Sequence, residues 1–305
     1  LQQNHARKSA YISYEDRFLP CKNFGYCVFF KEMWTLPTKR AYIKMLSAAM
    51  AVLLTACGSD DKNSGSTAAL PEIIIGSDIY PPYNFEDKNG QPMGIDVDLA
   101  REAFDRLGYK PVFVTINWED KTDLVNSGEI DCIWGSFSID GREDQYNWTI
   151  PYMYSHQVVA VGEDSDIYSL ADLADCRIAV QSTTKPESMF LDGTDERLPK
   201  VREVISLQDR ELIYPFLSKG YADAIAAHET AIVQYMNDYD LHCRILDEPL
   251  LTVGLGVAFS LNDDRGINDR LSETFEQMYA DGSFEEILGR YLDDPHKYLE
   301  VKPSE

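Results

Sequence analysis

From residue 70 onward, short apolar segments of strand length alternate with amphipathic segments of helix length, and few folds accommodate that alternation. In the segment 94–107, for example, Ile95, Leu99 and Ala103 recur at helical spacing, and Gly108 follows as a stop signal. Strands joined by crossover helices lie parallel in sheets that have helices on both faces. The first series has expected strands at 73–76, 112–116, 132–134 and 158–161, and expected helices at 94–107 and 117–127.

A second series of the same kind starts after Gly162, so the sequence predicts two α/β lobes. The series ends in one long apolar strand that is followed by two closing helices. Its expected elements are a helical turn at 170–174, strands at 178–180, 201–205, 224–226, 244–246 and 252–259, and helices at 185–191, 208–218, 229–236, 267–280 and 283–291.

The front of the chain has the pattern of an export signal. Positive side chains within residues 39–44 precede an apolar stretch at 45–54, which is too short to span a bilayer as a mature helix. Residues 54–57 read Leu-Thr-Ala-Cys, which resembles a bacterial lipobox. The alternative is a plain secretory signal with an incidental cysteine. The polar residues that follow suit a flexible tether.

The pattern of the export signal sets the boundaries of the segments within residues 1–69. We expect Cys57 to be the lipidated first residue of the mature protein, with translation starting at Met33 or Met45. Whatever precedes the signal is then upstream sequence, either non-native or untranslated, and not a domain. The resulting boundaries are 1–32 for the upstream segment, 33–56 for the signal peptide and 57–69 for the tether.

The chain is strongly acidic, with 51 Asp and Glu against 28 Lys and Arg among 305 residues. Such a surface repels phosphate backbones, so nucleic acid is not an expected partner. The only strongly apolar run lies in the signal-like segment, which excludes a protein with several membrane spans.

The cysteines after the signal do not show a spacing with histidine that suggests zinc, and we expect neither a metal nor a cofactor. Cys132 lies in an apolar run and is expected to be buried as a small hydrophobe. Cys176 and Cys243 each precede an Arg and a short strand. Outside the cytoplasm they could form a disulfide or stay free, because sequence does not fix connectivity.

Polar and aromatic residues follow several expected strands at their carboxyl ends. Each has an ordinary structural explanation as a turn, a surface ion pair or a helix cap, but their common position predicts one shared pocket. Hydroxyls, turn N–H groups and a guanidinium suit a carboxylate ligand. The residues are Tyr80 and Tyr83 after the first strand, Trp118 after the second, Ser136, Ser138 and Arg142 after the third, and Thr184 before a helix of the second series.

The order of these motifs resembles the bacterial extracellular solute-binding proteins of family 3, the polar amino-acid receptors of ABC importers. The resemblance covers residues 72–292. It implies an α/β fold of the periplasmic-binding-protein type II, whose two lobes, each an open and mostly parallel sheet flanked by helices, close on a ligand. The stretches that carry it are 74–85 (Ile-Ile-Gly-Ser-Asp-Ile-Tyr-Pro-Pro-Tyr-Asn-Phe), 87–100, 124–131, Ser138-Ile with Arg142, Pro151-Tyr-Met, Asp172-Leu-Ala and 281–288.

The resemblance also implies lobe boundaries and residue roles. Aromatic side chains would wall the ligand's side chain, hydroxyls and backbone groups would bond its carboxylate and amine, and a guanidinium would clamp the α-carboxylate. In that order these are Tyr80, Tyr83 and Trp118; Ser136 and Ser138, with an N–H from Thr184; and Arg142. The implied boundaries are 70–160 plus 252–305 for lobe 1, 163–249 for lobe 2, and hinges near 159–162 and 250–254.

Two features of the sequence depart from the family pattern. The loop from Ser138 to Arg142 is one residue shorter, with Gly141 in place of a bulkier residue. The acidic residue of lobe 2 that holds the ligand's α-ammonium in the family is replaced by His228, with Glu229 next. We expect His228 or Glu229 to face the ligand from lobe 2.

The resemblance thus implies an exported, lipid-anchored receptor on the extracytoplasmic face. It would bind a small amino-acid-like molecule, deliver it to an ABC permease in the membrane, and act as a monomer without enzymatic activity. Two alternatives stay open at this point. One is a dehydratase of the cyclohexadienyl or prephenate type, with Glu229 or His228 as its acid. The other is a sensory ligand-binding module without transport.

Overall fold

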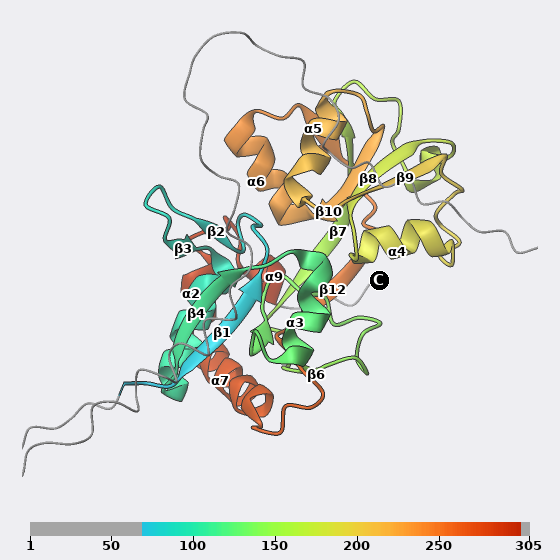
Figure 1. Ribbon diagram of the computed structural model, residues 1–305. Helices are drawn as coiled ribbons and strands as arrows, with labels where there is room; N and C mark the ends of the chain where they lie inside the picture. Colours follow the sequence, from blue (N-terminus) through green and yellow to red (C-terminus); the bar gives the residue numbers. More distant parts are fainter. Residues whose placement is uncertain (1–68, 300–305) are drawn as a thin grey trace, which may run out of the picture. The chain divides into compact units, whose positions relative to one another are not determined.

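The computed structural model describes residues 69–299. The upstream segment, the signal-like stretch, Cys57 and the tether up to residue 68 lie outside the described residues. Within residues 69–299 the chain forms two large β-sheets, one per lobe and each carrying helices, and a separate two-stranded hairpin (Figure 1). The two series of strands and helices expected from the sequence therefore correspond to two lobes.

The sheet of lobe 1 has five strands in the order β4-β1-β5-β13-β6. β1 pairs in parallel with β4 and β5, whereas β13 runs antiparallel to β5 and β6. The sheet is mixed rather than mostly parallel because β13 belongs to the segment that returns from the other lobe. Its strands are β1 (Glu72–Ser77), β4 (Lys110–Thr115), β5 (Cys132–Ile133), β6 (Asn147–Trp148) and β13 (Ala258–Phe259).

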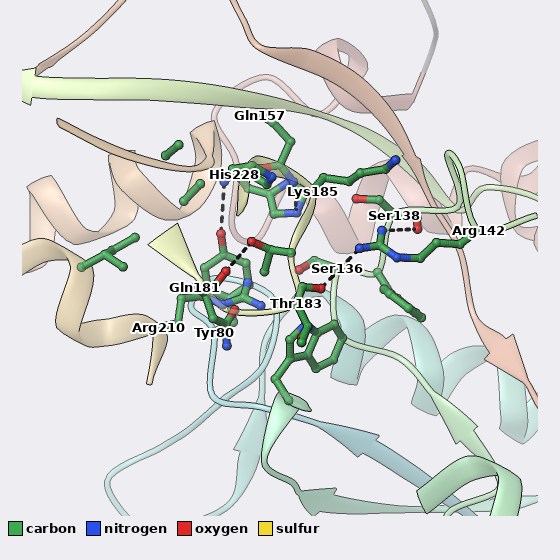
Figure 2. A pocket seen from close by; sticks show the side chains of 17 residues that line it. Tyr80, Ser136, Ser138, Arg142, Gln157, Gln181, Thr183, Lys185, Arg210 and His228 are labelled. Atoms are coloured by element: carbon green, nitrogen blue, oxygen red, sulfur yellow. Dashed lines mark hydrogen bonds between the residues drawn. The ribbon is translucent and has the colours of Figure 1, made fainter. Parts of the chain in front are cut away.

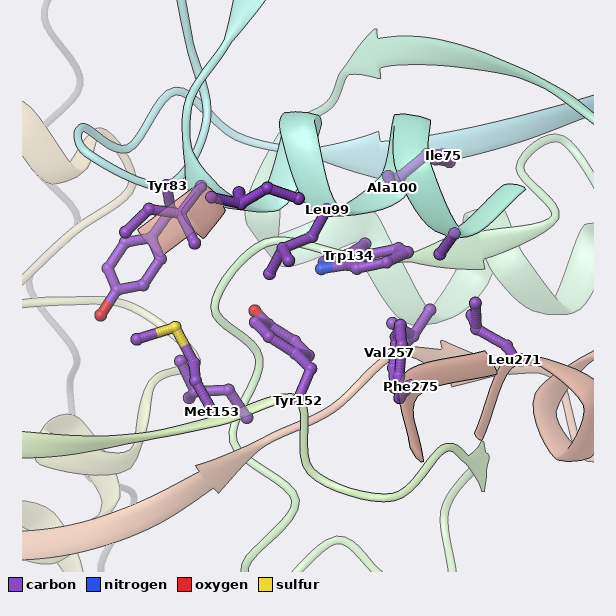
Figure 3. Packing of buried hydrophobic residues seen from close by; sticks show 14 of the residues in the cluster. Ile75, Tyr83, Leu99, Ala100, Trp134, Tyr152, Met153, Val257, Leu271 and Phe275 are labelled. Carbon is purple, nitrogen blue, oxygen red and sulfur yellow. The ribbon is translucent and has the colours of Figure 1, made fainter. Parts of the chain in front are cut away.

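Helix α2 (Ile95–Leu107) packs against α7 and α8, and its apolar face closes the core of lobe 1. At the centre of this core Trp134 contacts the rings of Tyr152 and Phe275, with centroids 5.6 and 5.5 Å away (Figure 3). The remaining elements of lobe 1 are η1 (Trp118–Asp120), α3 (Lys121–Ser127), α7 (Ile267–Asp281), α8 (Ser283–Leu288), α9 (His296–Leu299) and the hairpin β2 (Phe85–Glu86) and β3 (Pro92–Met93).

The sheet of lobe 2 has the order β11-β7-β10-β8-β9, and β12 pairs with β7 outside this path. β8 lies parallel to β9 and β10, whereas β7 runs antiparallel to β10, β11 and β12. The strands are β7 (Met153–Gly162), β8 (Arg177–Gln181), β9 (Glu203–Leu207), β10 (Ala224–His228), β11 (Cys243–Ile245) and β12 (Leu251–Leu255). The helices are η2 (Leu170–Leu173), α4 (Lys185–Asp192), η3 (Arg210–Leu212), α5 (Ile213–Ser218) and α6 (Glu229–Tyr239).

Two strand segments lead from one sheet to the other. β7 and β12 pair over residues 153–157 and 251–255, between β6 and β13 of lobe 1 and the rest of the lobe 2 sheet. The stretch 159–162, where we expected one crossing, instead pairs with β10 and β11 inside lobe 2. β7 is therefore longer than the sequence pattern indicated. The paired linkers lie nearer to lobe 1 than the crossing that we expected at 159–162.

The apolar segment 252–259 forms two strands and not the single long strand that we expected. β12 ends at Leu255 and β13 begins at Ala258, so the chain changes sheets at Gly256 and its neighbour. A Cβ atom at Gly256 would lie 2.8 Å from the side chain of Ile139. A larger residue at 256 would force the Ile139 side chain to move. The change of sheets at this point divides an apolar run that looks continuous in the sequence.

The cysteines of lobe 2 are not joined. Cys132, Cys176 and Cys243 are all free thiols within residues 69–299. Cys243 opens β11, whereas Cys176 precedes β8, and strands β7 and β10 lie between these two. Three strand spacings amount to about 14 Å, beyond the roughly 7 Å that a disulfide can bridge between Cα atoms. The disulfide that the sequence left open is therefore absent from this structure.

Among residues 69–299, no helix combines the length and the apolar character needed to cross a membrane.

Candidate functional site

A cavity lies where residues from both lobes meet, and Figure 2 shows the side chains that line it. Its empty volume is about 410 Å³, including its open mouth. Lobe 1 contributes loops that follow β1, β4 and β5, and lobe 2 contributes the loops that follow β8 and β9, the last residues of β10 and Gln157 of β7. The lining residues are Tyr80, Trp118, Ser136, Phe137, Ser138, Arg142, Gln157, Gln181, Thr183, Thr184, Lys185, Pro186, Arg210, Ile213, Ala226, Ala227 and His228.

Aromatic rings form the lobe 1 side of this cavity. Trp118 opens the 3₁₀ turn after β4, which Asn117 caps by accepting a hydrogen bond from the N–H of Glu119. The Trp118 ring packs edge-on against Phe137, with centroids 5.3 Å apart. Tyr80 follows β1 and is buried beside them. The sequence identified Tyr80 and Trp118, whereas Phe137 was missed because it reads as an ordinary core residue.

The turn after β5 presents Ser136, whose backbone φ of 47° lies in the left-handed region. The carboxylate of Asp96, in the first turn of α2, holds this turn by accepting a 2.7 Å hydrogen bond from the N–H of Ser136. Asp96 is 1% exposed, and burial raises its pKa to about 7. The Ser136 hydroxyl has no hydrogen-bond partner among the described residues, so it is available to a ligand.

Arg142 reaches the cavity from the loop that follows. Its guanidinium donates 3.3 Å hydrogen bonds to the carbonyl oxygens of Ser138 in lobe 1 and Thr183 in lobe 2. Its Cζ lies 5.2 Å from the centroid of the Phe137 ring. Burial lowers the pKa of Arg142, but an Arg stays charged at neutral pH. Arg142 and both predicted serines therefore converge on one side of the cavity.

In lobe 2, the segment between β8 and α4 borders the cavity. Thr184, as predicted, is the residue before α4, and its hydroxyl donates to the carbonyl of Gln181. Thr183 has a φ of 58°, and its hydroxyl accepts a 2.9 Å hydrogen bond from Lys121 of lobe 1. Burial lowers the pKa of Lys121 to about 8, so its ammonium is mostly protonated at pH 7.

Arg210 is the main site residue that the sequence did not reveal. It opens η3, which Asp209 caps, and its side chain is 6% exposed. Its guanidinium lies 3.3 Å from the centroid of the Tyr80 ring and 3.3 Å from Asp78 Oδ2. Gln181 also donates a 2.7 Å hydrogen bond to that oxygen. The signal that could have identified Arg210 is its position after β9. The residues that follow this strand do not form a glycine or serine motif, so the sequence did not draw attention to it.

His228 lines the cavity, as one of our two alternatives predicted. Its ring is neutral, because burial and then the charge of Arg210 lower its pKa to about 3. Gln157 donates through Nε2 to His228 Nε2 (2.9 Å), so Nδ1 carries the proton and faces Ser155 Oγ at 2.9 Å. The His228 N–H donates to the hydroxyl of Tyr80 across the cleft. Both ring nitrogens are thus occupied.

Two predicted site residues are not among the residues that line the cavity. Tyr83 is fully buried behind Tyr80, where its hydroxyl shares hydrogen bonds with Thr230 (2.7 Å) and Ser155 (3.2 Å). Figure 3 shows its ring within the lobe 1 core. Glu229 does not line the cavity, and both of its carboxylate oxygens accept hydrogen bonds from Lys297. A turn motif and a helix start do not reveal which way a side chain points.

Among the described residues, no group of three or more His, Cys, Asp and Glu side chains lies close enough to hold a metal ion.

Comparisons with known proteins agree on one class. Residues 73–294 match the model of the bacterial extracellular solute-binding proteins, family 3. The histidine-binding periplasmic protein of Salmonella typhimurium is 30% identical over 237 residues, which cover 74% of this chain and 90% of that protein. The glutamate-binding protein GluB of Corynebacterium efficiens is 26% identical over 287 residues, which cover 86% of this chain and 95% of that protein.

A solved structure shows the same fold. It is an ancestral arginine-binding protein bound to arginine, with a TM-score of 0.67 and 22% identity. The match covers 74% of this chain and all of that one.

Proposed function

The chain belongs to the bacterial extracellular solute-binding proteins of family 3, and we propose that it is the substrate-binding component of an ABC importer. It holds a small amino-acid-like molecule in the cleft between its lobes and delivers that molecule to a permease. The observation that carries this proposal is the convergence of polar groups from both lobes on one cavity, where Arg142 contacts Ser138 of lobe 1 and Thr183 of lobe 2.

We propose that the ligand's carboxylate binds to Arg142. A guanidinium offers paired N–H donors that match a carboxylate, and Ser136 supplies a hydroxyl that has no partner among the described residues. Thr184 adds a backbone N–H at the start of α4, where N–H groups are free to bind an anion. Tyr80 and Trp118 would flank the rest of the ligand.

Closure of the lobes would occur about the paired linkers β7 and β12. Residues 153–157 and 251–255 are the part of these strands that leads from one sheet to the other. We therefore propose the hinge in these two stretches, several residues before 159–162 on the first strand. Because each lobe supplies only part of the contacts, ligand binding favours the closed arrangement.

The dehydratase alternative lacks a suitable acid at the residues we named for it. The His228 ring is neutral, and Gln157 and Ser155 occupy both of its nitrogens. Glu229 is paired with Lys297 and does not line the cavity. Neither residue can protonate a leaving group in the cleft as placed, and the relatives compared above are all binding proteins.

The proposed function is tested by a thermal-shift screen of the purified chain with the twenty amino acids and small dicarboxylates. A ligand at 100 times its Kd should stabilise the protein by about 2.7 kcal/mol. Titration calorimetry should then give one site per chain. If no compound in the panel shifts the unfolding transition, the proposal is contradicted.

We further propose that the mature protein is anchored on the extracytoplasmic face through a lipid on Cys57, and that it is a monomer. The support for the anchor is the sequence Leu-Thr-Ala-Cys at 54–57 after an apolar stretch. A Cys57→Ser variant should be neither cleaved nor anchored in membranes. An unmodified N-terminus upstream of Cys57 in native membranes, detected by mass spectrometry, would contradict the anchor, and a dimer in sedimentation experiments would contradict the monomer.

A further inference from the structure

The charged side chains that line the cavity are all cationic. They are Arg142, Lys185 and Arg210, and the ammonium of Lys121 stands directly behind the lining residue Thr183. Among the described residues, no Asp or Glu lines the cavity. Figure 2 shows Arg142 and Arg210 on opposite sides of the pocket. The cavity therefore has a cationic group at each end, which favours a ligand with two anionic ends over one with a cationic group.

Two carboxylates bond to lining residues without lining the cavity: Glu187 accepts a 2.6 Å hydrogen bond from the N–H of Thr183, and Asp78 is paired with Arg210 and Gln181. Asp78 lies at the Arg210 end. Its Oδ2 accepts a hydrogen bond from Gln181 and lies 3.3 Å from the guanidinium of Arg210. Its Oδ1 has no partner among the described residues and is shielded from solvent. A ligand ammonium at Asp78 would have to approach beside Arg210, so repulsion between the two cations opposes it.

The two residues expected to hold an ammonium do not offer a free acceptor. His228 uses both ring nitrogens in hydrogen bonds with Gln157 and Ser155. Glu229 lies outside the cavity lining with both oxygens on Lys297. In the part of the chain that the structure describes, the acceptors left inside the cavity are neutral. They include the buried side-chain oxygens of Gln157 and Gln181, which have no partner in that part of the chain.

We propose that the ligand is a dicarboxylate whose carboxylates are bound by Arg142 at one end and Arg210 at the other, and that an α-ammonium group contributes little to its affinity. This inference rests on the proposed function and specifies the ligand class for the same cleft. Neutral oxygens can accept a hydrogen bond from an amine, but they do not compensate a buried positive charge among cations. An acidic amino acid and its amine-free counterpart should therefore both bind.

The first experiment compares matched ligands by titration calorimetry at fixed pH and ionic strength. The panel contains succinate, glutarate and adipate, L-glutamate, the monoamide of glutarate, L-glutamine, L-histidine and L-arginine. We expect at least one amine-free dicarboxylate to bind within about tenfold of L-glutamate. The matching monoamide should bind at least about 30-fold more weakly, which is the lower end of the cost of removing one partner of a buried charge pair.

The outcomes of this comparison are distinct. The dicarboxylate inference is wrong if L-arginine or L-histidine binds more tightly than every dicarboxylate. It is also wrong if L-glutamate binds more than about 100-fold more tightly than all amine-free acids. In both cases the proposed function stands. If no compound of the panel and no other amino acid binds, both fail together.

The second experiment uses two variants of the ion pair between Arg210 and Asp78, at the end of the cavity opposite Arg142. Arg210→Gln should reduce the preference for glutarate over its monoamide to less than about threefold, because the second carboxylate loses its cation. Asp78→Asn is the matched control: it removes the carboxylate that competes for Arg210, and it should strengthen dicarboxylate binding.

Each result bears on the assignment of Arg210. If Arg210→Gln keeps the full preference, or if Asp78→Asn weakens L-glutamate more than glutarate, the assignment is wrong and Asp78 holds the amine. Thermal unfolding of both variants shows whether they fold. If Arg210→Gln does not fold, the ligand series on the unaltered chain decides the question alone.

Discussion

Several side chains in the two walls of the cavity differ in which lobe supplies their packing, hydrogen-bond or ion-pair partners. On the lobe 1 wall, Trp118 packs on Phe137, and Ser136 is held by Asp96 of the same lobe. On the lobe 2 wall, Arg210 and Gln181 both contact Asp78 of lobe 1. The Thr183 hydroxyl likewise accepts its hydrogen bond from lobe 1.

This difference indicates which wall is formed before the ligand arrives. Lobe 1 fixes Trp118 and Ser136 by itself, so these two keep their positions when the lobes separate, whereas Arg142 and Tyr80 also contact lobe 2. In lobe 2, Arg210, Gln181 and Thr183 are held against lobe 1, so these groups exchange protein partners for ligand as the cleft opens and closes. Substitutions in lobe 1 should therefore cost more binding energy than substitutions at His228 or beyond it in lobe 2, and four predictions examine this order.

The largest effect is expected at the lobe 1 carboxylate clamp. Arg142→Ala should weaken binding of any carboxylate ligand by about 2–5 kcal/mol, the usual cost of truncating one partner of a buried charged pair. Calorimetric titration measures the loss, and circular dichroism checks that the fold persists. A variant that binds as tightly as the original chain would show that Arg142 does not hold the carboxylate.

The second effect concerns the support of the lobe 1 wall. The pKa of Asp96 is raised from 3.8 to about 7 by burial, so the folded state holds a proton that the unfolded state has released between these values. The free energy of unfolding should then fall as the pH rises from about 4 to 7, by a few kcal/mol. Asp96→Asn should remove this decline, which urea unfolding at pH 5 and pH 8 would measure. An identical pH dependence in both proteins would contradict it.

A smaller effect is expected at His228 in lobe 2. His228→Ala leaves Gln157 Nε2 without its partner and removes one of the two partners of Ser155, so it should lower the free energy of unfolding by about 1–3 kcal/mol. Ligand affinity should change less than in Arg142→Ala. Because the pKa of His228 is about 3, it should not make affinity vary between pH 5 and 8. An affinity that falls near pH 6.5 in the original chain, but not in the variant, would show that the imidazole contacts the ligand.

The smallest effect is expected at Glu229, which is bonded to Lys297 at the surface. Their side chains are 21% and 39% exposed, and an ion pair of this kind contributes about 0–1 kcal/mol. Glu229→Gln should therefore change ligand affinity by less than about twofold. Lys297→Met serves as the matched control, since both variants break the same pair. A larger loss in Glu229→Gln than in Lys297→Met would place the carboxylate in the binding site.

The sequence predicted most of the lobe 1 wall because its signals are local. Tyr80, Trp118, Ser136 and Arg142 each follow a strand, and in α/β sheets the loops at strand carboxyl ends meet at one edge. The alternation of strands and helices likewise predicted two lobes, since apolar periodicity depends on neighbouring residues alone. The apolar run 252–259 was visible too, but the change of sheets between Leu255 and Ala258 was not.

Only the tertiary structure decided which polar groups face the cleft and what they bind. Arg210 and Asp78 lie far apart in the chain, and the ion pair between them forms only when β9 and β1 end on opposite sides of one cavity. Tyr83 and Glu229 have the chemistry of site residues, yet one is turned into the core and the other toward Lys297. The sequence by itself determined the two lobes and brought Ser136, Ser138 and Arg142, the residues of the proposed carboxylate clamp, to one edge, because both depend on local pattern. The sign of the charge at the far end of the cavity depends on long-range packing, which no local pattern encodes.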